Sequence, residues 1–319
     1  VTVIQHHSFV KLPDNNYKPR SFDPRSGAIS VSYMDYSSPI DEKILKKNII
    51  RHRLEKKFPE NEKSEAIRPI VYYLDPGTPE PIRSALIEGA MWWNEAFESI
   101  GFIDAFQVKI LPENADPMDC RYNVIQWVHR STRGWSYGSN VSDPRTGEII
   151  KGHVSLGSLR VRQDYLIAQS LIQNPYLAEN KKKVLEMSLA RIRQLSAHEV
   201  GHTLGFAHNF SSSTKQRSSV MDYPHPLIKI KDDKINLDSA YAVGIGDWDK
   251  ISVAYSYSEF KENQNEKNEL NKILDKSYDD GYRFITDYDA RSVGGAHVNA
   301  HLWDNSEDVT SGLDEIIKI

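Results

Sequence analysis

The sequence predicts an α+β fold, in which a mixed sheet packs against long helices. Short apolar runs typical of buried strands occupy residues 70–74, 106–110 and 122–128. A helical pattern of apolar residues lies between the first two runs, at 80–100, and a second one covers 181–204. No internal repeat or low-complexity segment occurs along the chain. Strands and helices thus alternate, which is typical of a mixed class.

Length and composition limit the classes of protein to which the chain can belong. At 319 residues the chain exceeds a typical domain of about 100–200 residues, and one elaborated enzyme domain with extra segments fits equally well. Hydrophobic residues make up 39% and charged residues 26%, which is ordinary for a globular protein and excludes a disordered or membrane-embedded chain. The net charge of −4 does not indicate nucleic acid as a partner. Cys120 is the only cysteine, so packing and metal must stabilise the fold without an intrachain disulfide.

The first 65 residues are expected to form strands followed by a helix. Residues 1–4 and 28–33 alternate apolar and polar side chains between turn residues, as strands do. Between residues 40 and 66, apolar residues recur at helical spacing among many Lys, Arg and Glu residues. This spacing predicts an amphipathic helix with a solvated charged face.

Turn signals divide the middle of the chain. Asp75-Pro76-Gly77 ends the first buried strand, and Gly101 ends the helix that follows it. Gly, Asp-Pro and Thr-Gly turns in residues 134–158 predict a hairpin that leads into an edge strand at Gly152–Gly157. Residues 159–180 are interpreted as a helical insertion or loop before the long helix.

Residues 198–208 carry the pattern H-E-x-x-H-x-x-G-x-x-H, which marks the chemical centre of the chain. Residues four apart share a helix face, so His198 and His202 can present two imidazoles to one cation. Gly205 can adopt the left-handed conformation that ends a helix and turns the chain, which brings His208 to the same ion. Three neutral imidazoles leave one tetrahedral position for water, as a catalytic zinc ion requires.

Glu199 is the natural proton acceptor in this pattern. It follows the first histidine but does not itself bind the metal. Such a carboxylate can take a proton from the attacking water and deliver it to the leaving nitrogen.

A methionine-containing turn, Ser218–Pro224, follows the zinc pattern, and together they resemble the metzincin metallopeptidases. The resemblance implies a zincin-like fold, with a mixed twisted sheet and the active-site helix in an upper half and a mostly irregular or helical lower half. It implies that Met221 is the hydrophobic base beneath the histidines. It also implies that Tyr223 approaches the zinc or stabilises the tetrahedral intermediate, with a core tyrosine as the alternative. Asn209 departs from the named subfamilies, so the subfamily stays open.

The stretches 127–138 and 143–148 look like those of large, poorly characterised bacterial metzincin-like proteins, a resemblance that spans most of residues 30–319. It implies an extracytoplasmic location, secreted, periplasmic or at the cell surface. The chain starts at Val1 without a signal core, and no apolar run approaches the roughly 18 residues that span a bilayer. We therefore expect a soluble, processed piece whose anchor, if any, lies outside it.

Metzincins pair an edge strand above the zinc with extended substrate through main-chain hydrogen bonds. On this resemblance, the substrate contacts are predicted in the expected edge strand, with an ordinary sheet strand as the alternative. The residues are Gly152, His153, Val154, Ser155 and Leu156. His153 is interpreted as a bystander or substrate contact and not as a zinc ligand.

Residues 238–260 are expected to form a helix with a glycine interruption, and residues 261–281 a shorter one. Asp247 and Asp249 are candidates for orienting the histidines, but capping or solvated roles are favoured. His297 and His301 are four residues apart without helical periodicity, which does not favour a second metal site. No D-x-D-x-D-G loop indicates calcium.

The expected organisation is an N-terminal segment at 1–65, a catalytic domain at 66–260 and a C-terminal extension at 261–319. We predict a monomeric Zn²⁺ endopeptidase that acts on protein or peptide substrates. One alternative is a catalytically silent zinc-binding scaffold or interaction module of a larger surface protein. Another is a latent enzyme in which the N-terminal segment covers the cleft. Structural zinc sites usually fill all four positions, often with Cys, and three histidines without a nearby Cys favour the enzyme.

Overall fold

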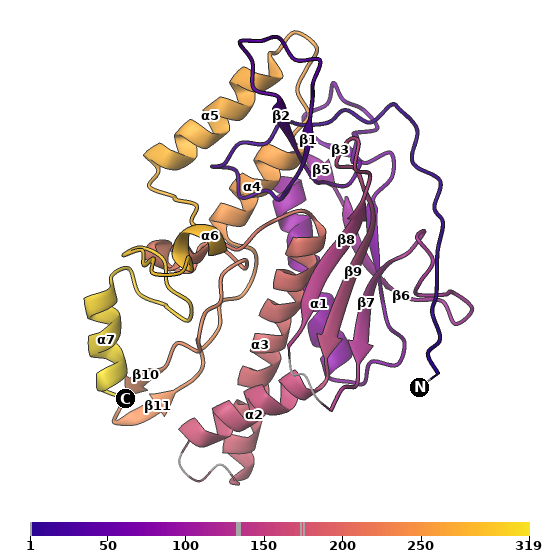
Figure 1. Cartoon of the computed structure of the whole chain (residues 1–319). Helices are drawn as coiled ribbons and strands as arrows, with labels where there is room; N and C mark the ends of the chain where they lie inside the picture. The colour runs from indigo at the N-terminus through magenta and orange to yellow at the C-terminus, as the bar shows by residue number, and fades with distance from the viewer. Residues whose placement is uncertain (1, 132–134, 173, 175) are drawn as a thin grey trace.

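A five-stranded mixed sheet forms one side of the molecule, on the right in Figure 1. The computed structural model describes residues 2–131, 135–172, 174 and 176–319. The strand order is β6-β4-β7-β9-β8, in which the first four strands run parallel and β8 runs antiparallel to β9. The mixed sheet expected from the sequence is confirmed. The strands are β4 (Ile70–Leu74), β6 (Phe106–Ile110), β7 (Asn123–Val128), β8 (Tyr137–Ser142) and β9 (Ile149–Gly157).

Two long helices, α1 (Ile82–Ser99) and α3 (Ala178–Thr203), pack together against one face of this sheet (Figure 1). Their backbones approach closely at Gly89, where a Cβ atom would lie 2.0 Å from the carbonyl oxygen of Arg193. Trp93 is fully buried and donates its indole N–H to the carbonyl of Ala197, 2.8 Å away. These contacts fix α3 before it reaches the zinc pattern. Both helices confirm the sequence prediction, and α2 (Leu159–Leu171) forms the helical insertion.

The prediction of an amphipathic helix between residues 40 and 66 is wrong. Instead, β1 (Ser30–Met34) pairs antiparallel with β2 (Leu45–Ile49), and β3 (Ser64–Glu65) pairs with β5 (Phe102–Ile103). Ile49 is fully buried in the β2 strand. Apolar residues at a helical spacing therefore lie in a β-strand here, because pairing with another strand overrides the local periodicity. The strand expected at 28–33 is confirmed, whereas residues 2–4 form no regular element and Val1 lies outside the described residues.

The N-terminal segment is joined directly to the turn that ends α3. The N–H of Ile29 donates to the carbonyl of Gly205 at 2.8 Å, and the N–H of Ala207 donates to the carbonyl of Gly27 at 2.9 Å. Gly205 has a φ of +101°, and a Cβ atom there would lie 2.1 Å from the carbonyl oxygen of Ile50. Only glycine fits this position, so the turn and the N-terminal segment depend on each other.

The chain beyond the zinc pattern is built mainly from loops and short elements. The helix expected at 238–260 forms only from residue 247 to 257, because Leu227 pairs with Ala240 and Gly244 takes a φ of +87°. The helix expected within 261–281 is confirmed as α5. No helix in the described part of the chain has the length and apolar character that crossing a bilayer requires. The remaining elements are η1 (Phe210–Lys215), β10 (Lys229–Lys231), β11 (Lys234–Asn236), α4 (Asp247–Tyr257), α5 (Glu266–Asp279), α6 (Asp287–Ala290) and α7 (Val309–Ile317).

The first testable prediction concerns the N-terminal segment. A chain that begins at Ser64 lacks the strand that pairs with Gly205 and also buried core residues such as Ile49 and Leu54. We expect it to lose cooperative thermal unfolding and zinc binding, measured by circular dichroism and metal analysis. A chain that begins at Tyr17 is the control, because most of the residues that it lacks are exposed. A folded, more active Ser64 chain would instead support a removable cover over the cleft.

Candidate metal centre

Three histidine side chains converge where α3 ends. His198 and His202 lie one turn apart on α3, and the turn at Gly205 returns the chain so that His208 faces them. The ligand atoms of the three lie within 4.8 Å of one another, and they are the only such group of His, Cys, Asp or Glu side chains among the described residues. His297 and His301 form no second group of this kind. The sequence-predicted triad is therefore brought together.

Each of the three rings donates its Nδ1 proton to an oxygen. His198 Nδ1 lies 2.8 Å from the carbonyl of Val220, and His202 Nδ1 lies 2.8 Å from the carbonyl of Phe206. His208 Nδ1 lies 2.6 Å from Oδ2 of Asp287. Carbonyl and carboxylate oxygens only accept, so Nδ1 carries the proton in each neutral ring. All three Nε2 atoms consequently present lone pairs.

These lone pairs face one another, and a bound metal ion would accept all three of them. Nε2 of His202 and Nε2 of His208 are 3.0 Å apart, although neither has a proton to donate in this tautomer. Nε2 of His198 is buried and has no hydrogen-bond partner. Burial and the two neighbouring rings hold the pKa of His198 well below its ordinary value, and burial lowers the pKa of His202 to about 4. Zinc–nitrogen distances of about 2.0–2.1 Å place tetrahedral nitrogen pairs about 3.3 Å apart, so the arrangement suits zinc.

Glu199 lies beside the triad but points to the edge strand. Its side chain is 4% exposed, and the N–H of Gly138 in β8 donates to its carboxylate. Burial raises the pKa of Glu199 to about 8, although the charge of Arg191 and the Gly138 N–H both oppose this shift. A divalent cation nearby would favour the ionised form. The three histidines that could hold a cation and a carboxylate that could accept a proton thus lie side by side, as metal-assisted hydrolysis requires.

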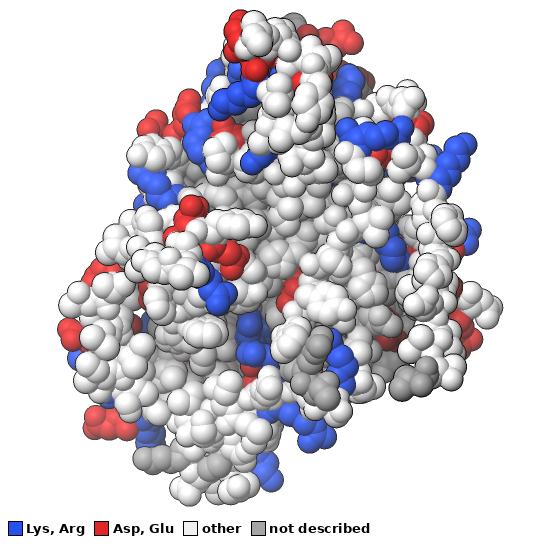
Figure 2. All heavy atoms as spheres, viewed as in Figure 1, with Lys and Arg blue, Asp and Glu red and all other residues white. Residues whose placement is uncertain are grey.

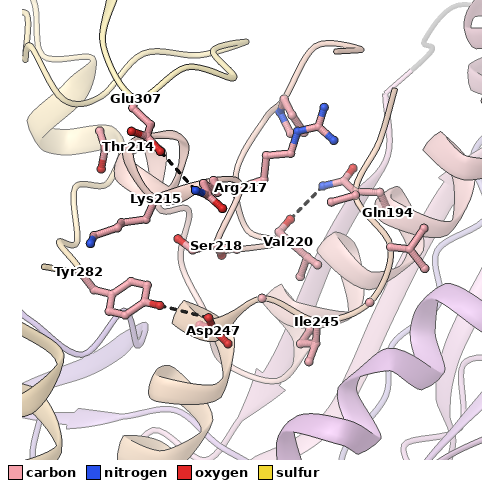
Figure 3. A pocket seen from close by; sticks show the side chains of 17 residues that line it. Gln194, Thr214, Lys215, Arg217, Ser218, Val220, Ile245, Asp247, Tyr282 and Glu307 are labelled. Atoms are coloured by element: carbon pink, nitrogen blue, oxygen red, sulfur yellow. Dashed lines mark hydrogen bonds between the residues drawn. The ribbon is translucent and has the colours of Figure 1, made fainter. Parts of the chain in front are cut away.

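The Met-turn (Ser218–Pro224) supports the triad from beneath. Met221 is buried against the helix backbone, where a Cβ atom on Gly201 would lie 2.2 Å from its sulfur. Asp249 accepts the N–H of Val220 at 2.8 Å, and the carbonyl of the same residue accepts from His198. Asp249 also caps α4, which was the role favoured for it. Asp247 instead accepts from the hydroxyl of Tyr282 and contacts no histidine of the triad (Figure 3).

Tyr223 lies next to the histidines. The centroid of its ring is 4.9 Å from that of His198 and 4.5 Å from that of His208. Burial, reinforced by the carboxylates of Glu199 and Asp287, raises the pKa of Tyr223 to about 12. A neutral phenol that can donate a hydrogen bond therefore stands beside the metal position. Its catalytic role stays a prediction.

Asp287 is a site residue that the sequence analysis missed. It begins α6 in the C-terminal extension and is 79 residues from the histidine that it binds. Carboxylates that accept from the second nitrogen of a metal-binding imidazole fix the ring and raise its basicity. No local pattern marks this residue, because an isolated Asp after Thr reads as an ordinary start of a helix.

The substrate strand predicted at Gly152–Leu156 is corrected. Main-chain groups of β9 pair with β7 on one side and with β8 on the other, so β9 is not the edge strand. The edge is β8, which was expected only as the first arm of the hairpin, and its Gly138 touches Glu199. Residues 132–134, within a stretch that resembles bacterial metzincin-like proteins, lie outside the described residues.

Comparison with known proteins agrees with this geometry. Residues 180–319 match a family described as Met-zincin, and residues 1–57 match a family described as Domain of unknown function (DUF5117). No curated protein matches the chain. One solved structure, the "GM1 bound form of the ECX AB5 holotoxin", is 14% identical over 79% of this chain and 89% of that chain. Its TM-score of 0.23 is too low to support any argument. The Met-zincin match and the triad support a metzincin-like family and a zinc-binding, metallopeptidase-like function.

The role of Asp287 can be tested by zinc affinity. Replacing Asp287 by Ala removes the acceptor that orients His208, and we expect zinc to bind about 10–100-fold more weakly. Competition with a chromophoric chelator at neutral pH measures the dissociation constant. Asp289→Ala, two residues away and exposed, is the matched control and should leave affinity unchanged. Equal zinc affinities of the two variants would contradict an orienting role.

The pKa of Glu199 predicts how the stability of the metal-free protein depends on pH. Between its ordinary value of 4.5 and about 8, the folded chain keeps a proton on Glu199 that the unfolded chain loses. Stability should therefore fall as pH rises through this window, and Glu199→Gln should remove that contribution. We compare the free energy of unfolding of Glu199→Gln with that of the parent. As pH rises from 4.5 to about 8, the value for the variant minus the value for the parent should increase by at most about 5 kcal/mol.

Denaturant titrations of the metal-free proteins at pH 5 and pH 8 provide the measurement. Glu186→Gln is the control, because Glu186 lies on the same helix but is exposed. A pH-independent difference between Glu199→Gln and the parent would show that Glu199 is ionised throughout.

Proposed function

We propose that this chain is a zinc-dependent endopeptidase in which Glu199 is the general base. The observation that carries the proposal is the common orientation of the three imidazoles, whose Nδ1 atoms all donate and whose Nε2 lone pairs converge. Three nitrogen ligands with a neighbouring carboxylate that does not ligate leave a coordination position for substrate or water. A purely structural zinc site normally fills that position with protein.

His198, His202 and His208 would hold the metal. When bound, zinc would polarise the scissile carbonyl and acidify a water molecule beside it. Glu199 would take the proton of the attacking water and deliver it to the leaving nitrogen as the peptide bond breaks. Its hydrogen bond from Gly138 keeps the carboxylate in position for both transfers.

Tyr223 would donate its phenolic proton in a hydrogen bond to the oxyanion that develops on the scissile carbonyl. The ring position beside His198 and His208 supports this role, and burial keeps the hydroxyl protonated over the neutral range. Met221 and Asp249 act only by holding the histidines and the Met-turn.

Extended substrate would add to the sheet at β8. An antiparallel edge strand offers unpaired main-chain groups to an incoming peptide. Because β8 also contacts Glu199, a peptide paired there would run past the base and the metal. The resemblance to the metzincin metallopeptidases supports a protein or peptide substrate. The resemblance to bacterial metzincin-like proteins supports an extracytoplasmic location, and we propose a monomer.

Glu199→Gln tests the proposal directly. The variant should bind one zinc ion per chain but hydrolyse a broad peptide library about 10²–10⁴-fold more slowly, because only the proton acceptor is lost. Mass spectrometry of the products and metal analysis give the two readouts. Glu186→Gln serves as the control and should cleave like the parent. Equal cleavage by Glu199→Gln would exclude its role as base. A parent chain that binds zinc and cleaves nothing would favour the silent scaffold.

A further inference from the structure

Arg191 lies two turns before His198 on α3 and points in nearly the same direction. Successive residues of an α-helix are about 100° apart, so seven residues place Arg191 within about 20° of His198. Glu199 contacts β8 on one side of this direction, and Gly201 contacts the Met-turn on the other. Arg191 therefore lies on the stretch of α3 between the edge strand and the Met-turn. Figure 2 shows a hollow beside the position of α3, with basic atoms at its floor.

The guanidinium of Arg191 is buried and forms no ion pair with a carboxylate of the described residues, although the charges of Asp164 and Glu199 both act on it. Its residue is 6% exposed, Nε has no hydrogen-bond partner, and the guanidinium lies 5.6 Å from the centre of the Tyr241 ring. Asp164 on α2 faces it, but this carboxylate is in an ion pair with Arg160 at 2.7 Å. Within the part of the chain that the structure describes, two arginines thus share one aspartate at this place.

Gln194 holds the guanidinium in place. Its Oε1 accepts from Nη1 of Arg191, and its Nε2 donates to the carbonyl of Val220 at 3.1 Å (Figure 3). The same carbonyl accepts from His198, so Arg191 is tied to the metal centre through one side chain and one peptide group. This arrangement fixes the orientation of a planar donor whose geometry matches a carboxylate.

The cavity behind the Met-turn offers no comparable cation. It has a volume of about 490 Å³ and is lined by Lys215 and Arg217 among others (Figure 3). Arg217 already donates to the carbonyls of Ser239 and Ala240 and to Asn305. Lys215 lies over the Tyr282 ring. Arg191 differs because it is buried and shares Asp164 with Arg160 without a direct ion pair of its own.

We propose that Arg191 binds a carboxylate of the substrate, either an acidic side chain or a free C-terminus, and so determines specificity. A buried guanidinium that no direct ion pair neutralises is unfavourable, and an incoming carboxylate would reduce this penalty while gaining two charge-assisted hydrogen bonds. Seven residues of helix span about 10 Å. An extended peptide covers about 3.3–3.6 Å per residue, so the carboxylate lies within about three residues of the scissile bond. The inference rests on the proposed peptidase function and names its substrate class.

Matched peptides test this specificity. Peptides that the parent chain cleaves are resynthesised with Glu or Gln at each of the three positions on either side of the scissile bond, and with acid or amide C-termini. We expect kcat/KM to be at least about tenfold higher for a carboxylate at one position, as for other hydrogen bonds to charged groups. Glu-against-Gln pairs identify a side-chain carboxylate, and acid-against-amide pairs identify a chain terminus.

Arg191→Met should abolish this preference, measured within the variant as the ratio of kcat/KM for the carboxylate peptide to kcat/KM for its neutral partner. Methionine is similar in volume, and replacing a buried charge by an apolar side chain is often tolerated by the fold. Arg191→Lys, which keeps the charge but not the planar fork, should retain part of the preference. Arg193→Met is the control, because Arg193 points away from the cleft and pairs with Glu88 at 2.6 Å. It should retain the full preference.

Binding separates this inference from the peptidase proposal. Fluorescence polarisation measures the affinity of zinc-loaded Glu199→Gln for hexapeptide pools that carry Glu or Gln at one fixed position, with acid or amide ends. If Glu199→Gln binds one carboxylate pool more tightly than its neutral partner, and the double variant Glu199→Gln/Arg191→Met does not, the inference is supported even if the parent cleaves nothing. Equal binding of all pools, or a preference that survives Arg191→Met, overturns it, even if the parent is an active peptidase.

Discussion

The donation of three imidazole protons to fixed oxygens is the constraint on which the site depends. Each donation assigns the proton to Nδ1 and leaves Nε2 free to bind a cation. Without those acceptors the rings could rotate or change tautomer, and the ligand atoms would no longer converge. The acceptors are a Met-turn carbonyl, a carbonyl of the turn after α3, and a carboxylate from the C-terminal extension.

Segments that are distant in sequence are therefore part of one centre. Residues 27–29 of the N-terminal segment pair with the turn around Gly205, which leads to His208. Asp249 accepts the N–H of Val220, the residue whose carbonyl receives the proton of His198. The edge strand reaches Glu199 through Gly138. The division into segments at residues 65 and 260 remains a prediction, and the hydrogen bonds that cross both points show how closely the segments cooperate.

The metal centre could be predicted from the sequence because most of its residues lie close together in the chain. His198, Glu199 and His202 share one helix, and the glycine at 205 is close enough to read as a turn. The strands of the sheet and both long helices were predictable for the same reason, since their periodicity extends over many residues. The Met-turn was found through a resemblance and not through physical periodicity.

The failures also have physical causes. Apolar residues between 40 and 66 fit a helical spacing, but strand pairing with residues 30–34 decided their conformation. Strand order depends on tertiary contacts, so the sequence could not show that β9 pairs on both sides. Asp287 reaches His208 across 79 residues, and the burial of Arg191 without a direct ion pair depends on tertiary contacts that the sequence does not show.

The bond between Asp287 and His208 also has a consequence for the order of events during biosynthesis. A nascent chain completes α3 and all three imidazoles long before the carboxylate of residue 287 leaves the ribosome, because 79 residues separate the two partners. Until then the ring of His208 lacks the carboxylate that accepts its proton, and the orientation of this ring is not fixed. Assembly of the complete centre thus waits until residue 287 has emerged, 79 residues after the last of the three histidines.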